Sequence, residues 1–182
     1  MPAIPVRLAL IVGSTREGRF GPTVADWFVT QVARHGGVEL TVLDLAAIEI
    51  PSAAFAERIG AADGFVVVTP EYNHSFPGPL KTALDSVREP WAAKPVAFVS
   101  YGGVSGGLRA VEALRLVFAE LHAMSIRETV SFASYWELFD GDGHLEDPAG
   151  PDAAASALLE QLLWWAHALR NARTAQPYGS PA

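Results

Sequence analysis

The chain has 182 residues, of which half are hydrophobic and 18% are charged, and this composition supports one compact domain and excludes intrinsic disorder. Its net charge of −7 provides no basic field for nucleic acid or for an anionic membrane surface. No apolar run approaches the roughly 18 residues of a membrane span. The absence of cysteine excludes disulfides, thiol chemistry and cysteine-based metal sites, and it fits a reducing cytoplasm. We therefore expect a cytoplasmic protein with neither a nucleic-acid nor a membrane partner.

Apolar, β-branched runs of strand length alternate with helical patterns along the chain. Strands are expected at Val6–Val12, Val38–Leu43, Gly64–Thr69, Val96–Ser100 and, more weakly, near Ile126–Ser131. Helices are expected at Pro22–Arg34, Ala53–Ala62, Pro79–Val87, Ser105–His122 and Asp152–Arg170. Strands that are apolar on both faces and alternate with helices indicate a parallel sheet covered on both sides. The predicted fold is a three-layer, flavodoxin-like, doubly wound α/β domain with a five-stranded parallel sheet of order 2-1-3-4-5.

We expect residues 1–173 to form this single domain and residues 174–182 to form a mobile C-terminal tail. The stretch Phe132–Pro151 carries several large apolar side chains, which we expect to fold over this domain or over a neighbour. Its polar turn contains Asp140 and Asp142 but lacks the ligand spacing and distal Glu of a calcium loop, so a solvated turn is expected.

Two apolar features predict self-association. The Ser105–His122 helix is apolar beyond one face, which indicates burial on two sides. Trp164 lies off the apolar stripe of the last helix, where it either caps the edge of the core or belongs to a subunit interface. Together they predict a homodimer or homotetramer.

The first, third and fourth strands each end in an unusual loop, and in a parallel sheet these ends share one edge. The first loop, Gly13–Gly21, holds two arginines, two hydroxyls and three glycines and precedes a helix that opens at Pro22. Backbone N–H groups at a helix N-terminus, with glycine and arginine beside them, suit a phosphate group. The loop matches neither the P-loop nor the dinucleotide fingerprint. A glycine-rich turn with surface arginines is the alternative interpretation.

The second loop reads PEYNHS and follows the third strand. Tyr72 and His74 are placed to flank a flat ring, and Asn73 is placed to bond its polar edge. Glu71 resembles a general base, but a turn-forming or helix-capping carboxylate is the favoured interpretation. A packing or solvent-facing role for His74 is favoured over a catalytic acid or base in the same way.

The third loop, Ser100–Gly107, contains four glycines within six residues, which is best explained by close approach of the main chain to a ligand. The helix N-terminus beyond it would favour partial negative charge on that ligand. Arg109, one turn further on, suits an ion pair at least as well as a ligand contact. A phosphate site, an aromatic polar loop and a glycine-rich loop on one edge describe a pocket for a phosphorylated flat heterocycle, and flavin mononucleotide (FMN) is its natural occupant.

Three segments, GSTREGRFGP, TPEYNHSFPGPLKTALD and SYGGVSGGLRAVEALR, resemble the signature segments of the NADPH-dependent FMN reductase family of flavodoxin-like flavoproteins. The resemblance runs from the first strand to about Ser131 and implies FMN as cofactor with NADPH or NADH as electron donor. It also assigns FMN-binding residues in three groups. These are Ser14, Arg16, Arg19, Phe20, Gly21 and Pro22 at the phosphate, Pro70, Glu71, Tyr72, Asn73 and His74 around the isoalloxazine, and Ser100, Tyr101, Gly102, Gly103 and Gly106 at its other edge.

These features predict an FMN-dependent NAD(P)H oxidoreductase that passes electrons to a small acceptor, namely a quinone, an azo compound, a metal ion, free flavin or dioxygen. Because the cofactor supplies the redox chemistry, no catalytic side chain and no metal ligand is expected. The alternative is a non-enzymatic FMN electron carrier or redox sensor, although the two arginines of the phosphate loop favour an enzyme. A phosphoacceptor receiver domain is disfavoured, because Gly13-Ser14 and Pro70-Glu71 stand where it needs acidic residues. The short connection Asp44–Ala62 leaves the acceptor open.

Overall fold

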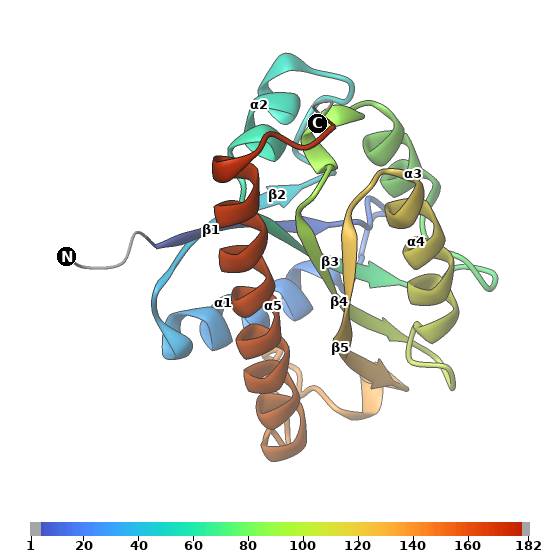
Figure 1. The fold of residues 1–182 in the computed structure, drawn as a ribbon. Helices are drawn as coiled ribbons and strands as arrows, with labels where there is room; N and C mark the ends of the chain where they lie inside the picture. The colour runs from blue at the N-terminus through green and yellow to red at the C-terminus, as the bar shows by residue number, and fades with distance from the viewer. Residues whose placement is uncertain (1–4, 180–182) are drawn as a thin grey trace.

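A computed structural model describes residues 5–179 as a parallel sheet with helices on both faces (Figure 1). The strands are β1 (Val6–Val12), β2 (Val38–Asp44), β3 (Gly64–Pro70), β4 (Pro95–Gly102) and β5 (Met124–Ala133). They form one five-stranded sheet of order β2-β1-β3-β4-β5 in which every neighbouring pair is parallel. The predicted fold class and strand order are confirmed.

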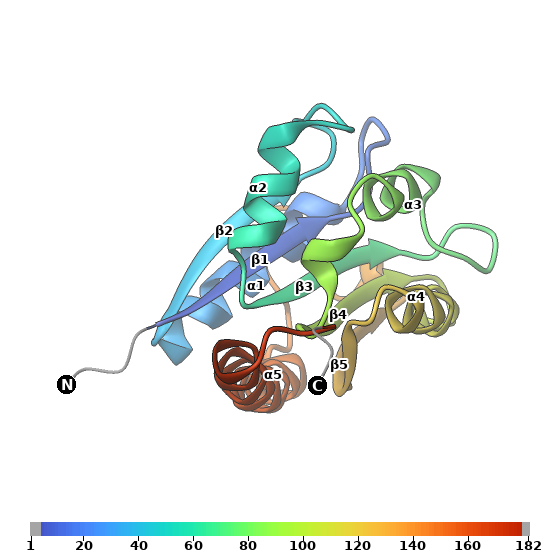
Figure 2. The same ribbon diagram turned by 45° about the horizontal axis from the view of Figure 1, so that its top comes forward.

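Helices cover the sheet in two layers, as Figure 2 shows from a tilted view. They are α1 (Gly21–His35), α2 (Ala53–Ala61), α3 (Gly78–Asp85), α4 (Leu108–Glu120) and α5 (Ala149–Ala175), with single 3₁₀ turns η1 (Glu89–Trp91) and η2 (Tyr135–Glu137). Side chains of β1 alternate between the two layers, so Leu10 packs with Phe28 of α1 and Leu162 of α5, and Ile11 packs with Phe55 of α2. Within residues 5–179, no helix is long and apolar enough to span a bilayer.

The turn between β4 and α4 differs from the prediction. The strand continues to Gly102, and the helix begins at Leu108, three residues after the predicted start at Ser105. Gly106 and Gly107 have φ values of 59° and 87°, a backbone conformation that a right-handed helix cannot include. A Cβ atom on Gly107 would lie 2.7 Å from the Cβ of the strand residue Ser100. The glycines therefore let the chain turn back closely over the end of β4 before the helix starts.

The last helix is longer than predicted. The sequence predicts Asp152–Arg170, whereas α5 spans Ala149–Ala175, so Thr174, the first residue of the predicted tail, is helical. Residues 180–182 of that predicted tail lie outside the described residues.

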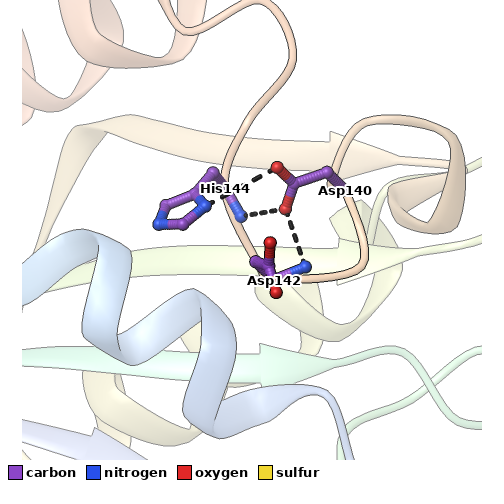
Figure 3. Close-up of side chains that lie close together, drawn as sticks. All are labelled: Asp140, Asp142 and His144. Atoms are coloured by element: carbon purple, nitrogen blue, oxygen red, sulfur yellow. Dashed lines mark hydrogen bonds and ion pairs between the residues drawn. The ribbon is translucent and has the colours of Figure 1, made fainter.

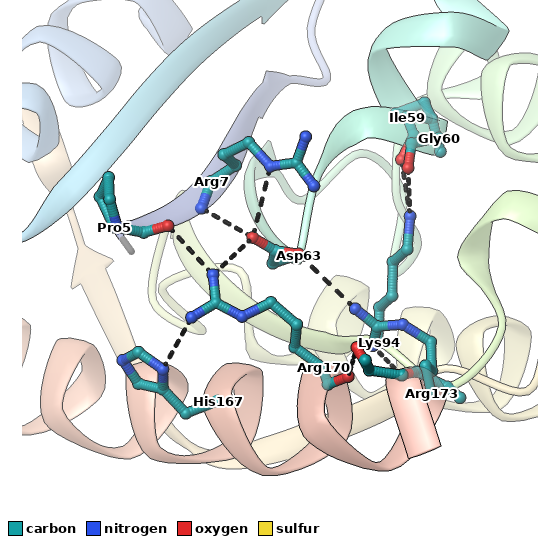
Figure 4. Close-up of polar contacts among 11 residues, drawn as sticks. Pro5, Arg7, Ile59, Gly60, Asp63, Lys94, His167, Arg170 and Arg173 are labelled. Atoms are coloured by element: carbon teal, nitrogen blue, oxygen red, sulfur yellow. Dashed lines mark hydrogen bonds and ion pairs between the residues drawn. The ribbon is translucent and has the colours of Figure 1, made fainter. Parts of the chain in front are cut away.

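At the amino-terminal edge of the sheet, one buried carboxylate joins the first strand to the last helix (Figure 4). Asp63, which precedes β3, has a side chain 3% exposed and accepts a hydrogen bond of 3.1 Å from the backbone N–H of Arg7. The carboxylate also pairs with the guanidinium groups of Arg7, Arg170 and Arg173 at 3.5, 3.3 and 3.7 Å. Burial alone would raise the pKa of the Asp63 carboxyl, but the hydrogen bonds from Arg7 and the charges of Arg7 and Arg170 outweigh burial and lower it.

Candidate functional site

Three loops meet at the carboxyl-terminal edge of the sheet and line one cavity of about 250 Å³. The walls come from the loop after β1, the loop after β3, the end of β4 and the turn η2. The lining residues are Arg16, Glu17, Gly18, Arg19, Phe20, Pro70, Glu71, Tyr72, Tyr101, Gly102, Gly103 and Tyr135. The segments 14–21, 70–75 and 100–107, which the sequence predicts to share one cleft, therefore all contribute to this cavity.

Nine of the predicted cofactor-binding residues line the cavity, and seven do not. The seven are Ser14, Gly21, Pro22, Asn73, His74, Ser100 and Gly106. Ser14 and Ser100 are fully buried beneath the lining residues, whereas Asn73 and His74 are exposed. The roles of all these residues toward a cofactor stay predictions.

The loop after β1 is held close to the start of α1. The Ser14 hydroxyl accepts a hydrogen bond of 3.2 Å from the Tyr101 hydroxyl, and burial raises the pKa of Tyr101, so the phenol stays protonated. A Cβ atom on Gly21, the first residue of α1, would lie 2.4 Å from the Ser14 Oγ, so any other residue there would displace the Ser14 hydroxyl. Within residues 5–179, the backbone N–H groups of Ser14 and Thr15 donate to no protein acceptor. Unpaired N–H groups at the N-terminus of a helix suit an anion.

Arg19 is fixed by a partner that the sequence analysis missed. Its guanidinium donates to Asp44 Oδ1 and Oδ2 at 2.5 and 2.6 Å, and to the backbone oxygen of Ser14 at 2.5 Å. The hydrogen bond between the two side chains lowers the pKa of Asp44 and raises that of Arg19. Three of the five N–H donors of Arg19 are used in these bonds, which leaves two for a ligand. Asp44, the last residue of β2, therefore orients a cation at the cavity wall.

The loop after β3 is a tight two-residue turn. Tyr72 and Ser75 exchange backbone hydrogen bonds of 2.8 and 3.0 Å, and Asn73 and His74 between them have φ values of 50° and 65°. Positive φ at both central residues is the geometry of a type I′ turn, in which asparagine is favoured. Asn73 and His74 are therefore at the exposed tip, while the Tyr72 ring remains at the cavity, with the guanidinium carbon of Arg16 3.5 Å from its centroid.

Glu71 caps α4, as the favoured interpretation of the sequence predicts. Its carboxylate accepts hydrogen bonds from the Ser105 hydroxyl at 2.7 Å and from the backbone N–H of Arg109 at 3.1 Å. The Arg109 guanidinium donates to the same carboxylate at 2.8 Å, which makes Arg109 an ion-pair partner of Glu71. Burial alone would raise the pKa of Glu71, but these bonds lower it. The N-terminus of α4 thus faces a carboxylate of its own chain, and its predicted preference for negative charge on a ligand stays a prediction.

Aromatic side chains close one end of the cavity. The Tyr135 ring lies 4.6 Å from the Phe20 ring and 5.3 Å from the Tyr101 ring, measured between centroids. Tyr135 is not among the predicted site residues, although the apolar stretch that contains it is expected to fold over this domain or over a neighbour. Trp136 beside it is 58% exposed, so that stretch is only partly buried within one chain.

Residues 6–137 match the family model described as NADPH-dependent FMN reductase. The chain belongs to the NADPH-dependent FMN reductase family. It is 33% identical over 176 residues to a quinone reductase of Pseudomonas putida, an alignment that covers 87% of this chain and 93% of that protein. The predicted family is confirmed. Its description, NADPH-dependent FMN reductase, agrees with the predicted enzyme class, a reductase, with the predicted electron donor, NADPH, and with the predicted cofactor, FMN.

Two further similarities agree with this family. An NAD(P)H-dependent FMN reductase of Schizosaccharomyces pombe is 36% identical over 123 residues, or 57% of this chain, and the chain spans only 62% of that relative. The structure of FerB, a flavoenzyme NAD(P)H:(acceptor) oxidoreductase from Paracoccus denitrificans, matches with a TM-score of 0.69 at 19% identity and covers 88% of this chain and 97% of that one. At this identity the likeness to FerB shows the shared fold.

The residues of the cavity fit FMN. The unpaired N–H groups of Ser14 and Thr15, together with Arg16 and Arg19, supply donors and positive charge for a phosphate. On the opposite side a Cβ atom on Gly103 would have its nearest neighbour at 3.8 Å, so the backbone there is open to a flat ring.

A separate cluster of possible ligand atoms lies in the loop before α5 (Figure 3). Asp140, Asp142 and His144 bring one ligand atom each within 4.8 Å of one another, a proximity that the sequence analysis did not predict. All three residues are exposed, and Asp140 Oδ1 accepts the backbone N–H groups of Asp142 and His144 at 3.0 and 2.8 Å. These bonds, the one from His144 first, lower the pKa of Asp140. The carboxylate stabilises a solvated turn, as predicted.

Proposed function

We propose that this protein binds FMN in the cavity at the carboxyl-terminal edge of its sheet and passes electrons from NADPH or NADH to a small acceptor of the quinone type. Bound FMN supplies hydride acceptance from the nicotinamide and electron transfer to the acceptor. The observation that carries the proposal is the convergence of a cationic loop, an aromatic loop and a glycine edge on one cavity. The names of the relatives from Pseudomonas putida and Schizosaccharomyces pombe support it.

The chain's own residues bind and orient the cofactor. Arg16, Arg19 and the N–H groups of the loop after β1 hold the phosphate, and Asp44 keeps Arg19 directed toward the cavity. Tyr72 and the backbone of Gly102 and Gly103 contact the flat ring, while Phe20, Tyr101 and Tyr135 exclude water from the closed end.

Titration of FMN with purified protein tests binding, and we expect quenching of the flavin fluorescence at a stoichiometry of one FMN per chain. Arg19→Met should weaken FMN binding at least about tenfold, because a charge-assisted contact is lost. Arg34→Met is the matched control, since Arg34 lies on the far part of α1, pairs with Asp152 and should leave affinity unchanged.

Anaerobic addition of NADPH or NADH to the FMN-loaded protein should bleach the oxidised flavin spectrum, and benzoquinone should restore it. Flavin that binds but is not bleached by either donor would contradict the reductase and leave the electron carrier. Flavin that does not bind would contradict both.

We also infer a homo-oligomer in the cytoplasm. Leu108 and Leu116 of α4 are 50% and 76% exposed, so the second apolar side of α4 is not covered within one chain, and Trp164 of α5 is likewise 64% exposed. Light scattering coupled to size exclusion measures the mass, and a monomer at micromolar concentration would contradict the oligomer.

The lack of cysteine supports a reducing compartment, which cell fractionation can test.

A further inference from the structure

A second hollow lies at the opposite, amino-terminal edge of the sheet, and its volume is larger than that of the cavity in which we propose that FMN binds. It measures about 610 Å³ and is formed by the segment around η1, the residue before β4, the end of α4 and the end of α5. Arg88, Lys94, His122, Arg173 and Tyr178 are among its lining residues. The FMN-binding residues predicted above do not contribute to it, because they follow the carboxyl ends of the strands.

The hollow has a buried cation that still has a hydrogen-bond donor to give. Lys94 is 7% exposed, and its ammonium group donates to the backbone oxygens of Ile59 and Gly60 at 3.0 and 2.9 Å (Figure 4). An ammonium group has three N–H donors. Among the residues that the structure describes, the third N–H of Lys94 has no oxygen or nitrogen acceptor, and the ammonium nitrogen lies 5.6 Å from the centroid of the Phe65 ring. A buried donor without an acceptor is unfavourable, and a ligand oxygen in the hollow would satisfy it.

The surrounding charge is positive. The guanidinium groups of Arg7, Arg170 and Arg173 surround the buried carboxylate of Asp63, and the same carboxylate attracts the Lys94 ammonium from further away. Burial is the largest cause that lowers the pKa of Lys94, to about 8, and the charge of Arg173 is the second. The attraction of Asp63 raises this pKa and offsets the two causes only in part. The pKa of Arg173 is lowered by burial in the same way. Positive charges therefore outnumber the single buried carboxylate beside the floor of the hollow.

Two acidic residues also line this hollow, but at its rim. Glu89 and Glu120 are both exposed, so their charges are hydrated and screened by salt. Asp63 is therefore the one buried counter-charge that the described residues place beside Lys94 and Arg173.

An apolar hollow adjoins the cationic one. It measures about 520 Å³ and shares His122, Arg173 and Tyr178 with it. Its other walls include Met124, Trp165 and Leu169. The Tyr178 hydroxyl and the Nδ1 of His122 are 2.8 Å apart, so this pair stands where the two hollows meet. The two hollows therefore share one wall, with the cations on one side of it and the apolar side chains on the other.

We propose that the two adjoining hollows form a second binding site, for a small organic anion with an apolar body. The anionic end, a carboxylate or sulfonate, accepts the third N–H of Lys94 and faces Arg173. The apolar body lies along Met124, Trp165 and Leu169. Charge complementarity selects the first end and burial of apolar surface selects the second.

Octanoate and octan-1-ol are matched probes, because they share the chain and differ in the charge. We expect octanoate to shift the backbone amide resonances of Lys94, Ala123 and Leu169 in the full chain saturated with FMN, and to leave those of Gly18 and Gly102 in place. Octan-1-ol should bind at least about tenfold more weakly. Equal affinity for the two probes, or octanoate shifts scattered over the surface, would overturn the proposal.

Adjacent tryptophans provide a matched pair of variants. Trp165 lines the apolar hollow, whereas Trp164 is 64% exposed and does not. Trp165→Ala should weaken both probes severalfold, and Trp164→Ala should weaken neither. Lys94→Met should weaken octanoate at least about tenfold and leave octan-1-ol unchanged. If Lys94→Met fails to fold, the comparison of the two probes on the unaltered chain decides the charge requirement.

Discussion

Asp63→Asn should destabilise the protein strongly, because it removes the only negative charge that the structure shows in contact with three arginines. The Asp63 side chain is 3% exposed, and the guanidinium groups lie 3.3 to 3.7 Å away. Asparagine keeps an acceptor for the backbone N–H of Arg7 but leaves the arginines uncompensated. Breaking a buried ion pair in this way costs about 3–5 kcal/mol. For a chain of this size that corresponds to a fall in Tm of about 6–20 °C.

Thermal unfolding followed by circular dichroism at pH 7 measures the effect. Asp85→Asn is the matched control, because Lys81 and Asp85 form an ion pair of 2.6 Å whose side chains are 45% and 57% exposed. An exposed pair contributes less than about 1 kcal/mol, so the control should lower Tm by at most about 4 °C. If Asp63→Asn lowered Tm no more than the control, the assignment of Asp63 as the centre of the network would be refuted.

The pH dependence gives a second check on the same carboxylate. The pKa of Asp63 is lower in the folded protein than its ordinary value, so the unfolded chain binds the proton more readily. Its stabilisation is therefore complete above the ordinary carboxyl pKa of about 3.9 and is lost as the pH falls toward the folded value. The difference in stability between the unaltered chain and Asp63→Asn should be full at pH 7 and shrink below about pH 4.

Two further substitutions probe the candidate site. Gly21→Ala should weaken FMN binding at least about tenfold, because its Cβ would lie 2.4 Å from the Ser14 Oγ. Gly60→Ala is the control and should leave FMN affinity unchanged, because a Cβ there meets nothing within 4 Å. Equal affinities of the two variants in fluorescence titrations would contradict the role of the close approach at Gly21. Glu71→Gln should lower the free energy of unfolding by about 1–2 kcal/mol, as measured by chemical denaturation. The loss is moderate because the Arg109 side chain is half exposed, so that water already weakens its attraction to the carboxylate. An unchanged denaturation midpoint would show that the Glu71 cap does not stabilise the chain.

Local patterns in the sequence were sufficient for the fold. Strands buried on both faces, such as Gly64–Pro70, are continuous apolar runs, and the helices between them follow from a period of 3.6 residues. Once the strands are parallel, their carboxyl ends share an edge, so the convergence of the three loops also followed from the sequence. The motifs of those loops identified the family, which the match over residues 6–137 confirms.

Helix ends were less predictable, because they depend on backbone contacts with other elements. The helix α4 begins at Leu108 and not at the predicted Ser105, because the chain turns back over the end of β4 at Gly106 and Gly107. The last turns of α5 carry Arg170 and Arg173, whose guanidinium groups contact the distant Asp63.

The partners of the charged residues were decided by the tertiary structure alone. Arg19 is a candidate phosphate ligand by sequence, but its bond to Asp44 joins residues 25 apart in the chain. The bond between Arg109 and Glu71 joins residues 38 apart, and that between Arg170 and Asp63 joins residues 107 apart. Periodicity and motifs report on neighbours within one element, whereas a buried charge is paired by whichever element the fold brings beside it.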